Sequence, residues 1–185
     1  MTAPEILSNE HRAIELVLEA MEKSAARLET GNKVDPSIVV DCLDFASGFA
    51  DKCHHAKEED ALFPMLEKRG VAKEGWPIGV MLHDHQIGRD FILSIRENLT
   101  KWQSGDESAA APLAEALKGY AGHLRSHIYK EDNVLFVMAS GLLSDEDNAE
   151  LIKAFDDIEE KKIGPGVHEA YHKMLDELED KIKQM

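Results

Sequence analysis

Residues 54–64 read HHAKEEDALFP, and residues 127–137, HIYKEDNVLFV, repeat much of the same pattern. Both stretches fit H-x-x-K-E-[ED]-x-x-L-F, in which a histidine and a glutamate stand four positions apart. On a helix this spacing places both side chains on one face, one turn apart. The repeated pattern therefore predicts two helices that each carry an ionisable pair beside apolar residues.

The composition indicates a globular protein and excludes several classes of partner. Of its 185 residues, 43% are hydrophobic and 31% are charged, which suits one domain with a sizeable core. The net charge of −15 argues against binding to nucleic acid or to an anionic membrane, because phosphate contacts need a basic surface. We find no signal peptide and no apolar run long enough for a membrane span. We therefore expect a cytoplasmic protein, and the sequence identifies no protein partner.

Capping residues and helix breakers divide the chain into long helices. Asp35 and Pro36 have the character of an N-cap and a first helical residue, and Ser144 with Asp147 resembles a capping box. Strand-like alternation is essentially missing, so we predict an all-α fold. The predicted helices are a first that ends at 30–32, a second from 36 to about 68, a third from about 77 to 104, a fourth from about 110 to 139, a fifth from about 144, and a short last one after 164–166.

Apolar residues follow one face of each of the first four helices at spacings of three and four. Such stripes, joined by short connections, predict an up-down-up-down four-helix bundle. We assign residues 1–140 to this bundle and residues 141–185 to a C-terminal helical extension packed on the same domain. On the fourth helix the inward stripe consists of Leu117, Tyr120, Leu124, His127, Glu131, Val134 and Met138.

Ionisable residues interrupt all four stripes. A single histidine on an apolar stripe is usually a core residue with a hydrogen-bond partner, but the same feature on four helices favours one shared site. Two buried carboxylates need positive charge nearby, and only Lys57 and Lys130 flank the stripes. Metal ions would supply that charge. The interrupting residues are His11, His54, His85, His127, Glu58 and Glu131.

The kind and number of ligands favour two metal ions over one. Four imidazoles and two carboxylates are too many for a tetrahedral zinc ion, and nitrogen and oxygen donors without thiolate favour iron. In an up-down bundle the second and fourth helices are parallel and diagonal, so their histidine–glutamate pairs face each other. A ferritin-like bundle would need paired E-x-x-H motifs, and only Glu169 with His172 fits, unpaired.

The two repeated stretches, with NEHR at 9–12 and HDH at 83–85, resemble the hemerythrin-like (HHE cation-binding) family of bacterial type. The order and spacing of these motifs match across residues 5–140. The resemblance implies two iron ions bridged by two carboxylates and by an oxo or hydroxo group. It also implies that the terminal ligands are His11, His54, His85 and His127 and that the bridges are Glu58 and Glu131.

The sequence departs from the oxygen carriers of this family. Those proteins have two histidines one turn apart on the third helix, whereas Met81 and Arg89 stand one turn either side of His85. Any fifth histidine ligand must therefore come from elsewhere. His123 is the first candidate for a metal ligand, because it lies one turn before His127 and next to the stripe; a histidine at the flank of the bundle is an equal alternative.

The remaining histidines and acids receive weaker assignments. His55 points about 100° away from His54 on an α-helix, so we expect it to support a ligand or to be exposed. His83 is expected on the surface. His168 and His172 form a pair one turn apart that is able to hold an adventitious metal ion, but exposure is favoured. The acids expected to be solvated or to orient ligands are Glu59, Asp60 and Asp132.

The resemblance leaves three functions open. The first is reversible binding of a small diatomic ligand, mainly O₂, for sensing, delivery or scavenging. The second is an enzyme that acts on peroxide or nitric oxide, or in iron-centre repair, so enzymatic activity stays undecided. The third is a metal-dependent switch that docks a partner protein through its acidic surface or terminal helices. We rank O₂ binding first.

Overall fold

The computed structural model describes residues 1–162, 164 and 166–184, without the side chains of His168 and Glu169. These residues form helices and no strand, which confirms the all-α prediction. Three segments are π-helical: Ala46–His55, Glu58–Leu62 and Glu131–Leu135. The α-helices are α1 (Ala3–Glu29), α2 (Pro36–Phe45), α3 (Phe63–Lys68), α4 (Ile78–Gln103), α5 (Ala110–Lys130), α6 (Phe136–Leu142), α7 (Asp145–Lys162) and α8 (Val167–Lys183).

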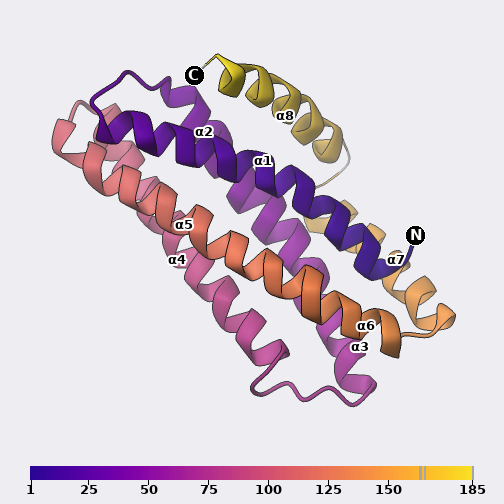
Figure 1. The fold of residues 1–185 in the computed structure, drawn as a ribbon. Coiled ribbons are helices and arrows are strands. Elements are labelled where there is room, and N and C mark those ends of the chain that lie inside the picture. The colour runs from indigo at the N-terminus through magenta and orange to yellow at the C-terminus, as the bar shows by residue number, and fades with distance from the viewer. Residues whose placement is uncertain (163, 165, 185) are drawn as a thin grey trace.

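Four long helices form the bundle. The second bundle helix runs without a break through α2, two π-helical segments and α3, and the fourth runs through α5, one π-helical segment and α6. Figure 1 shows α1 and α5 side by side, and α5 also packs on α4. Because α2 contacts both α1 and α4, the second and fourth bundle helices lie diagonally opposite each other, as predicted.

Side-chain caps begin the helices where the sequence predicts them. Asp35 accepts a hydrogen bond of 2.9 Å from the backbone N–H of Ser37 at the start of α2. At the start of α7, Asp147 accepts from the Ser144 N–H at 2.9 Å, and the Asp147 N–H donates to the Ser144 hydroxyl at 3.2 Å. These bonds satisfy N–H groups that a helix leaves without partners at its first turn.

The π-helical segments change which residues face the core. A π-helix has wider turns than an α-helix, so the inward face moves on along the chain. The stripe prediction is wrong at Val134, which is 41% exposed, whereas the next residue, Leu135, is fully buried. Glu58 and Glu131 begin corresponding π-helical segments, so the shift occurs at the same position of both repeated stretches.

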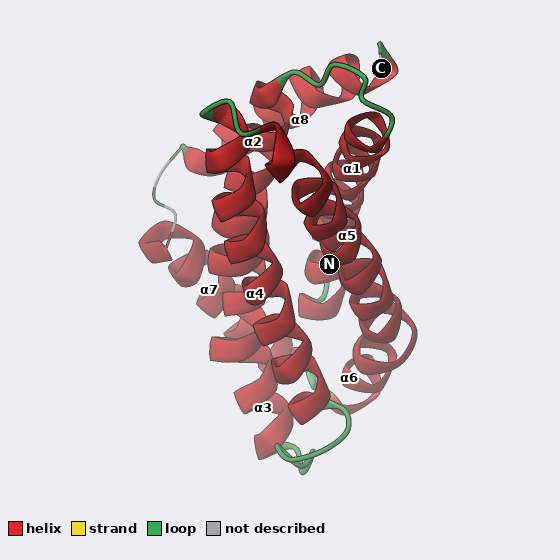
Figure 2. Ribbon diagram, turned by 90° about the vertical axis from the view of Figure 1, so that its left-hand side faces the viewer, coloured by secondary structure: helices red, strands yellow, loops and turns green. Residues whose placement is uncertain are grey.

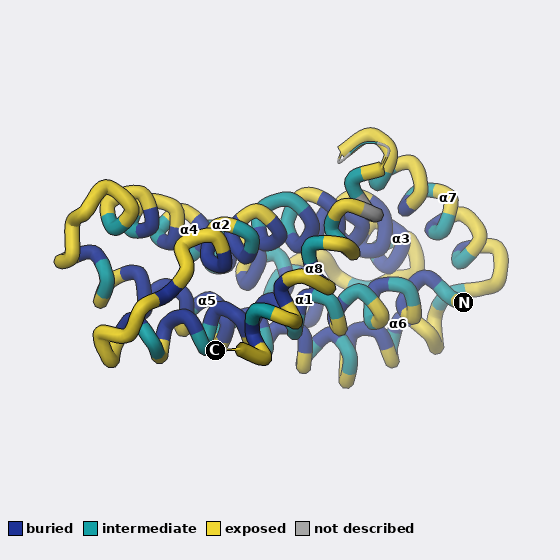
Figure 3. Tube along the Cα trace, turned by 90° about the horizontal axis from the view of Figure 1, so that it is seen from above, coloured by how far each residue is buried: buried dark blue, intermediate teal, exposed yellow. Residues whose placement is uncertain are grey.

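The C-terminal helices cover the outside of the bundle. Helix α8 lies over α1 and α2, while α7 contacts the π-helical segments of the second bundle helix (Figures 1 and 2). Tyr171 of α8 fits against Gly48, where an added Cβ would lie 1.9 Å from the tyrosine oxygen. Figure 3 shows that both helices keep a largely exposed outer side. The residues of α8 that join the bundle core are Leu175, Leu178 and Ile182.

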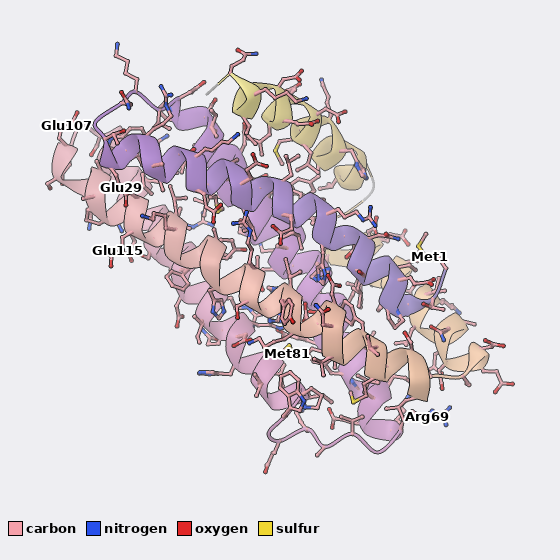
Figure 4. The ribbon with its side chains drawn as sticks, viewed as in Figure 1. Met1, Glu29, Arg69, Met81, Glu107 and Glu115 are labelled. Carbon is pink, nitrogen blue, oxygen red and sulfur yellow. The ribbon has the colours of Figure 1, made fainter. Side chains whose placement is uncertain are left out.

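Charged side chains surround the bundle, including its ends. Figure 4 shows Glu29 and Glu115 toward one end of the bundle and Arg69 at the other. On the outer surface, Arg125 of α5 forms ion pairs with Glu15, at 2.9 Å, and with Glu22 of α1. Of the helices in the described part of the chain, none is both long and apolar enough to span a bilayer.

We predict that Leu178→Ala loosens α8 without unfolding the bundle. Leu178 is fully buried, and truncating a buried leucine costs about 2–5 kcal/mol. Amide hydrogen exchange should therefore accelerate throughout α8 and stay slow in α5, because a peripheral helix opens locally. Asp176→Ala, at an exposed position of the same helix, is the control. Unchanged exchange in α8 would contradict the assignment of Leu178 as its anchor.

Candidate metal centre

Seven buried side chains form two adjoining groups of potential metal ligands between the bundle helices. Within each group, one nitrogen or oxygen atom per residue lies within 4.8 Å of the others. All seven residues are at most 3% exposed. The three-histidine group consists of His55, Glu58, His85 and His127, and the two-histidine group consists of His11, His54 and Glu131.

The Nε2 atoms of the histidines point at one another. They are 3.2 Å apart between His11 and His54, and 3.2 Å apart between His85 and His127. Imidazole nitrogens that converge in this way are suited, once deprotonated, to binding a common cation.

The two glutamates each reach both groups. The carboxylate oxygens of Glu58 lie 3.9 Å from His54 Nε2 and 3.3 Å from His85 Nε2. Those of Glu131 lie 3.3 Å from His11 Nε2 and 3.0 Å from His127 Nε2. Each carboxylate therefore places one oxygen in either group, which is the arrangement that a bridge between two ions requires.

The glutamates are buried without adequate hydrogen bonding. Among the described residues, no hydrogen-bond partner is found for either oxygen of Glu58 or of Glu131, nor for Nε2 of His55. Leaving a buried carboxylate in this state is costly, since its desolvation is not compensated. Acceptor atoms without donors, together with converging imidazoles, fit a pair of cations.

The pKa shifts reflect the same shortage of positive charge and hydrogen-bond donors around the two buried glutamates. Burial and the neighbouring charge of Glu131 raise the pKa of Glu58 well above its ordinary value. Burial opposes ionisation of Glu131, but His127 and His11 hold the pKa of this carboxyl well below its usual range. Burial likewise opposes the charge on His11, but Asp132 and Glu131 raise its pKa to about 10. Without metal, histidine charge therefore favours the ionised form of Glu131, while burial and the charge of Glu131 disfavour the ionised form of Glu58.

A second layer of carboxylates orients the imidazoles. Each of the five histidines has its Nδ1 atom directed at a carboxylate, so Nε2 faces inward in every case. Carboxylates in this position fix the ring and make a metal-binding histidine more basic. The pairs are His11 with Asp132 at 2.9 Å, His54 with Glu10 at 2.8 Å, His55 with Asp51 at 3.4 Å, His85 with Glu59 at 2.6 Å and His127 with Asp84 at 3.4 Å.

Cations hold this second layer in turn. Lys57 donates to Glu10 at 2.5 Å and to Glu159 of α7 at 3.1 Å, and its side chain is only 2% exposed. Lys130 forms the equivalent ion pair with Asp84. In both repeated stretches, the lysine therefore binds the carboxylate that orients the histidine three residues before it.

The repeated pattern continues into its last residues. The acid that follows each buried glutamate orients the histidine of a neighbouring helix, since Glu59 binds His85 and Asp132 binds His11. The phenylalanine at the end of each stretch stacks on the same histidine. The ring centroids are 6.0 Å apart for Phe63 with His85 and 5.5 Å apart for Phe136 with His11. The two halves of the site thus have matching contacts.

His55 breaks this correspondence. Ile128 stands at its place in the second stretch, directly after His127. The His55 ring stacks on that of His85, with centroids 4.0 Å apart and planes 13° apart. His54 and His55 are the last two residues of a ten-residue π-helical segment, whose wider turns move the face that meets the core along the chain.

The structure brings together six of the seven residues predicted from the sequence as metal ligands, and His123 lies outside both groups. Its Nε2 is 2.8 Å from the backbone carbonyl oxygen of Asp84, so the half-buried ring is directed at α4. His55 belongs to the three-histidine group instead, and its burial excludes the exposed role considered for it. The α-helical angle assumed for residues 54–55 caused this error.

Other residues lie as expected or outside the described side chains. His83 is exposed, and Asp60 forms a surface ion pair of 3.3 Å with Lys162. His172 is exposed, but the side chain of His168 lies outside the described residues, and with it the proposed pair. The sequence analysis missed three orienting carboxylates. Two of them, Glu10 and Asp84, directly precede a histidine of the site, and this shared acid–histidine pair is the signal that would have revealed them.

Comparison with known proteins identifies relatives of this chain. The family described as hemerythrin HHE cation binding domain matches residues 2–139. An uncharacterized protein of Mycobacterium tuberculosis is 23% identical over 185 residues, which cover 100% of this chain and 71% of that protein. The iron-sulfur cluster repair protein YtfE of Edwardsiella ictaluri is 31% identical over 130 residues, which cover 69% of this chain and 57% of that protein.

We predict that Glu58→Gln has opposite effects on the metal-free and metal-loaded proteins. The pKa of Glu58 is raised on folding, so its contribution to stability is complete only below the unfolded value and decreases as the pH rises. At pH 7, the metal-free variant should therefore melt at least ~2 °C above metal-free wild type, and this gain should shrink at pH 5.

In the metal-loaded protein, the same substitution should lower the melting temperature, because an amide is a poor replacement for a bridging carboxylate. Calorimetry of both forms at both pH values provides the test. A variant that is less stable than wild type in both forms would argue that Glu58 has an ordinary structural role.

Proposed function

Because the chain belongs to the hemerythrin HHE cation-binding family, we propose that it is a non-haem di-iron protein that binds O₂ or a related diatomic molecule. Its potential ligands are imidazole nitrogens and carboxylate oxygens, a donor set without thiolate that suits iron. In this proposal the terminal ligands are His11, His54, His55, His85 and His127, and the bridges are Glu58 and Glu131.

The unequal number of histidines carries the proposal. With both glutamates bridging, and with the oxo or hydroxo bridge that the family resemblance implies, one ion would have three imidazoles and three oxygen donors, and the other two imidazoles and three oxygen donors. An octahedral-leaning ion in the two-histidine group therefore has one more position for an external ligand. Reduced iron at such a position supplies electrons that a diatomic ligand is able to share.

The surroundings favour a small, weakly polar ligand. The seven potential ligand residues are at most 3% exposed, which excludes a bulky substrate. Since Ile128 corresponds in the repeat to His55, we propose that the external ligand lies beside Ile128. This side chain is 6% exposed and belongs to the same apolar core as Leu124. Apolar walls keep water away from the ligand, which slows side reactions.

A role in iron-centre repair is the second candidate, and the similarity to the iron-sulfur cluster repair protein supports it. Donation of iron requires release of the ion. The burial of the ligands and the five oriented histidines oppose release, so we rank this function below diatomic binding. Rapid transfer of iron to a metal-free acceptor protein, compared with slow loss to buffer, would reverse this order.

The proposal predicts two ions per chain. Protein loaded anaerobically with iron(II) and then oxidised should contain close to two iron ions and show oxo-to-iron charge-transfer absorption in the near ultraviolet. Elemental analysis and an optical spectrum provide the measurement. One tightly bound zinc ion, with no uptake of a second metal, would contradict a di-iron centre.

The proposal also predicts that His55 and His123 differ in function. His55→Leu should retain two irons, but with a second open position the oxidised protein should bind two azide ions per chain, whereas wild type binds one. The reduced variant should also be oxidised by air about tenfold faster or more, a difference of roughly 1.4 kcal/mol in activation free energy.

His123→Ala is the matched control, because its ring contacts the Asp84 backbone and neither group of ligands. It should resemble wild type in azide stoichiometry and in oxidation rate. If His123→Ala changed both and His55→Leu changed neither, the fifth ligand would be His123.

A further inference from the structure

The third histidine has partners that the other half of the site lacks. His55 is oriented by Asp51, which in turn binds Arg89 of α4. At the corresponding positions of the other half stand Ile128, Leu124 and Glu15. The two halves of the site, which otherwise match, therefore differ in chemical character at the positions of His55, Asp51 and Arg89.

Arg89 connects the orienting carboxylates of two histidines. Its Nε donates to Asp51 Oδ1 at 2.8 Å, and its Nη2 donates to Glu59 Oε1 at 2.8 Å. Those same oxygens face the Nδ1 atoms of His55, at 3.4 Å, and His85, at 2.6 Å. The planar guanidinium thus sets the distance between the carboxylates behind two stacked rings.

We propose that Arg89 is a positioning residue that holds His55 in the three-histidine group and so makes the two metal positions unequal. This inference rests on the proposed function, since it assigns to Arg89 the difference between a closed and an open ion. Arg89 acts through Asp51 and Glu59 and touches neither a ligand nitrogen nor the bridges.

The need for Arg89 follows from the charges around it. Asp51, Glu59 and Asp60 line one surface pocket of about 170 Å³ together with Arg89, Lys52 and Lys162, and Lys162 pairs with Asp60. Without the guanidinium, Asp51 and Glu59 lose the cation that binds both of them and are free to turn toward water, since their side chains are 21% and 25% exposed. The contact between His55 Nδ1 and Asp51 Oδ1 is long, at 3.4 Å, so it depends on Asp51 keeping its place.

Arg125 offers a matched control for this experiment. It is similarly exposed, at 37% against 34% for Arg89, and also pairs with two carboxylates on another helix. Its partners, Glu15 and Glu22, orient none of the five histidines. Arg89→Met and Arg125→Met therefore remove comparable ion pairs, but only the first disturbs the metal centre.

The test measures release of cobalt(II) from the fully loaded protein to an excess of chelator. In Arg89→Met, one of the two ions should leave about 10- to 100-fold faster than in wild type, while the other keeps its rate. The visible absorption of bound cobalt(II) should also become stronger, because it increases as the coordination number falls. Arg125→Met should resemble wild type in both, and Arg89→Lys should be intermediate.

A double-mutant cycle separates positioning from general support of the fold. In the His55→Leu background, Arg89→Met should accelerate release less than it does in wild type, because only the Glu59–His85 contact is left for Arg89 to support. Unchanged release from Arg89→Met, equal acceleration of both ions, or additive effects in the double variant would overturn the inference while leaving the two-ion centre intact. If wild type holds a single ion, the proposed function fails. Faster release of that ion from Arg89→Met would then still support the positioning role of Arg89, and unchanged release would overturn it.

Discussion

Two buried carboxylates without donors are the constraint on which this structure depends. Glu58 and Glu131 are fully buried, and no described side chain gives them a hydrogen bond of ordinary geometry. Around them, each imidazole is backed by a carboxylate, and four of the five carboxylates are backed in turn by lysine or arginine. The outer layers stabilise the inner ones only while every imidazole keeps its orientation. The bundle therefore surrounds two carboxylates whose charge its own side chains do not fully neutralise.

Much of this arrangement was predictable from local pattern. The helix starts at Pro36 and Asp145, the bundle topology and the inward positions of six potential ligands follow from caps and from spacings of three and four. The outward position of Val134 and the inward position of His55 did not follow, because both depend on π-helical segments. A π-helix has no sequence signature of its own, and it forms where tertiary contacts favour an insertion in the helical register.

The orienting carboxylates were only partly predictable, for a different reason. Glu59 and Asp132 stand next to Glu58 and Glu131, so a supporting role was visible in the sequence. Asp51 and Arg89, by contrast, meet from different helices and gain significance only from the side chains between them. Pairing between helices depends on rotation and tilt in the bundle, which periodicity in one segment does not determine.

The contact between Lys57 and Glu159 has a thermodynamic consequence beyond the packing of α7. Lys57 joins this helix to Glu10, and through it to His54 in the two-histidine group. If metal occupancy strengthens the His54–Glu10–Lys57 chain, it also strengthens the attachment of α7, and by reciprocity a firmly attached α7 raises metal affinity by the same factor. Attachment of α7 and binding of the ions are then thermodynamically coupled, so that a change in either one is measurable as a change in the other.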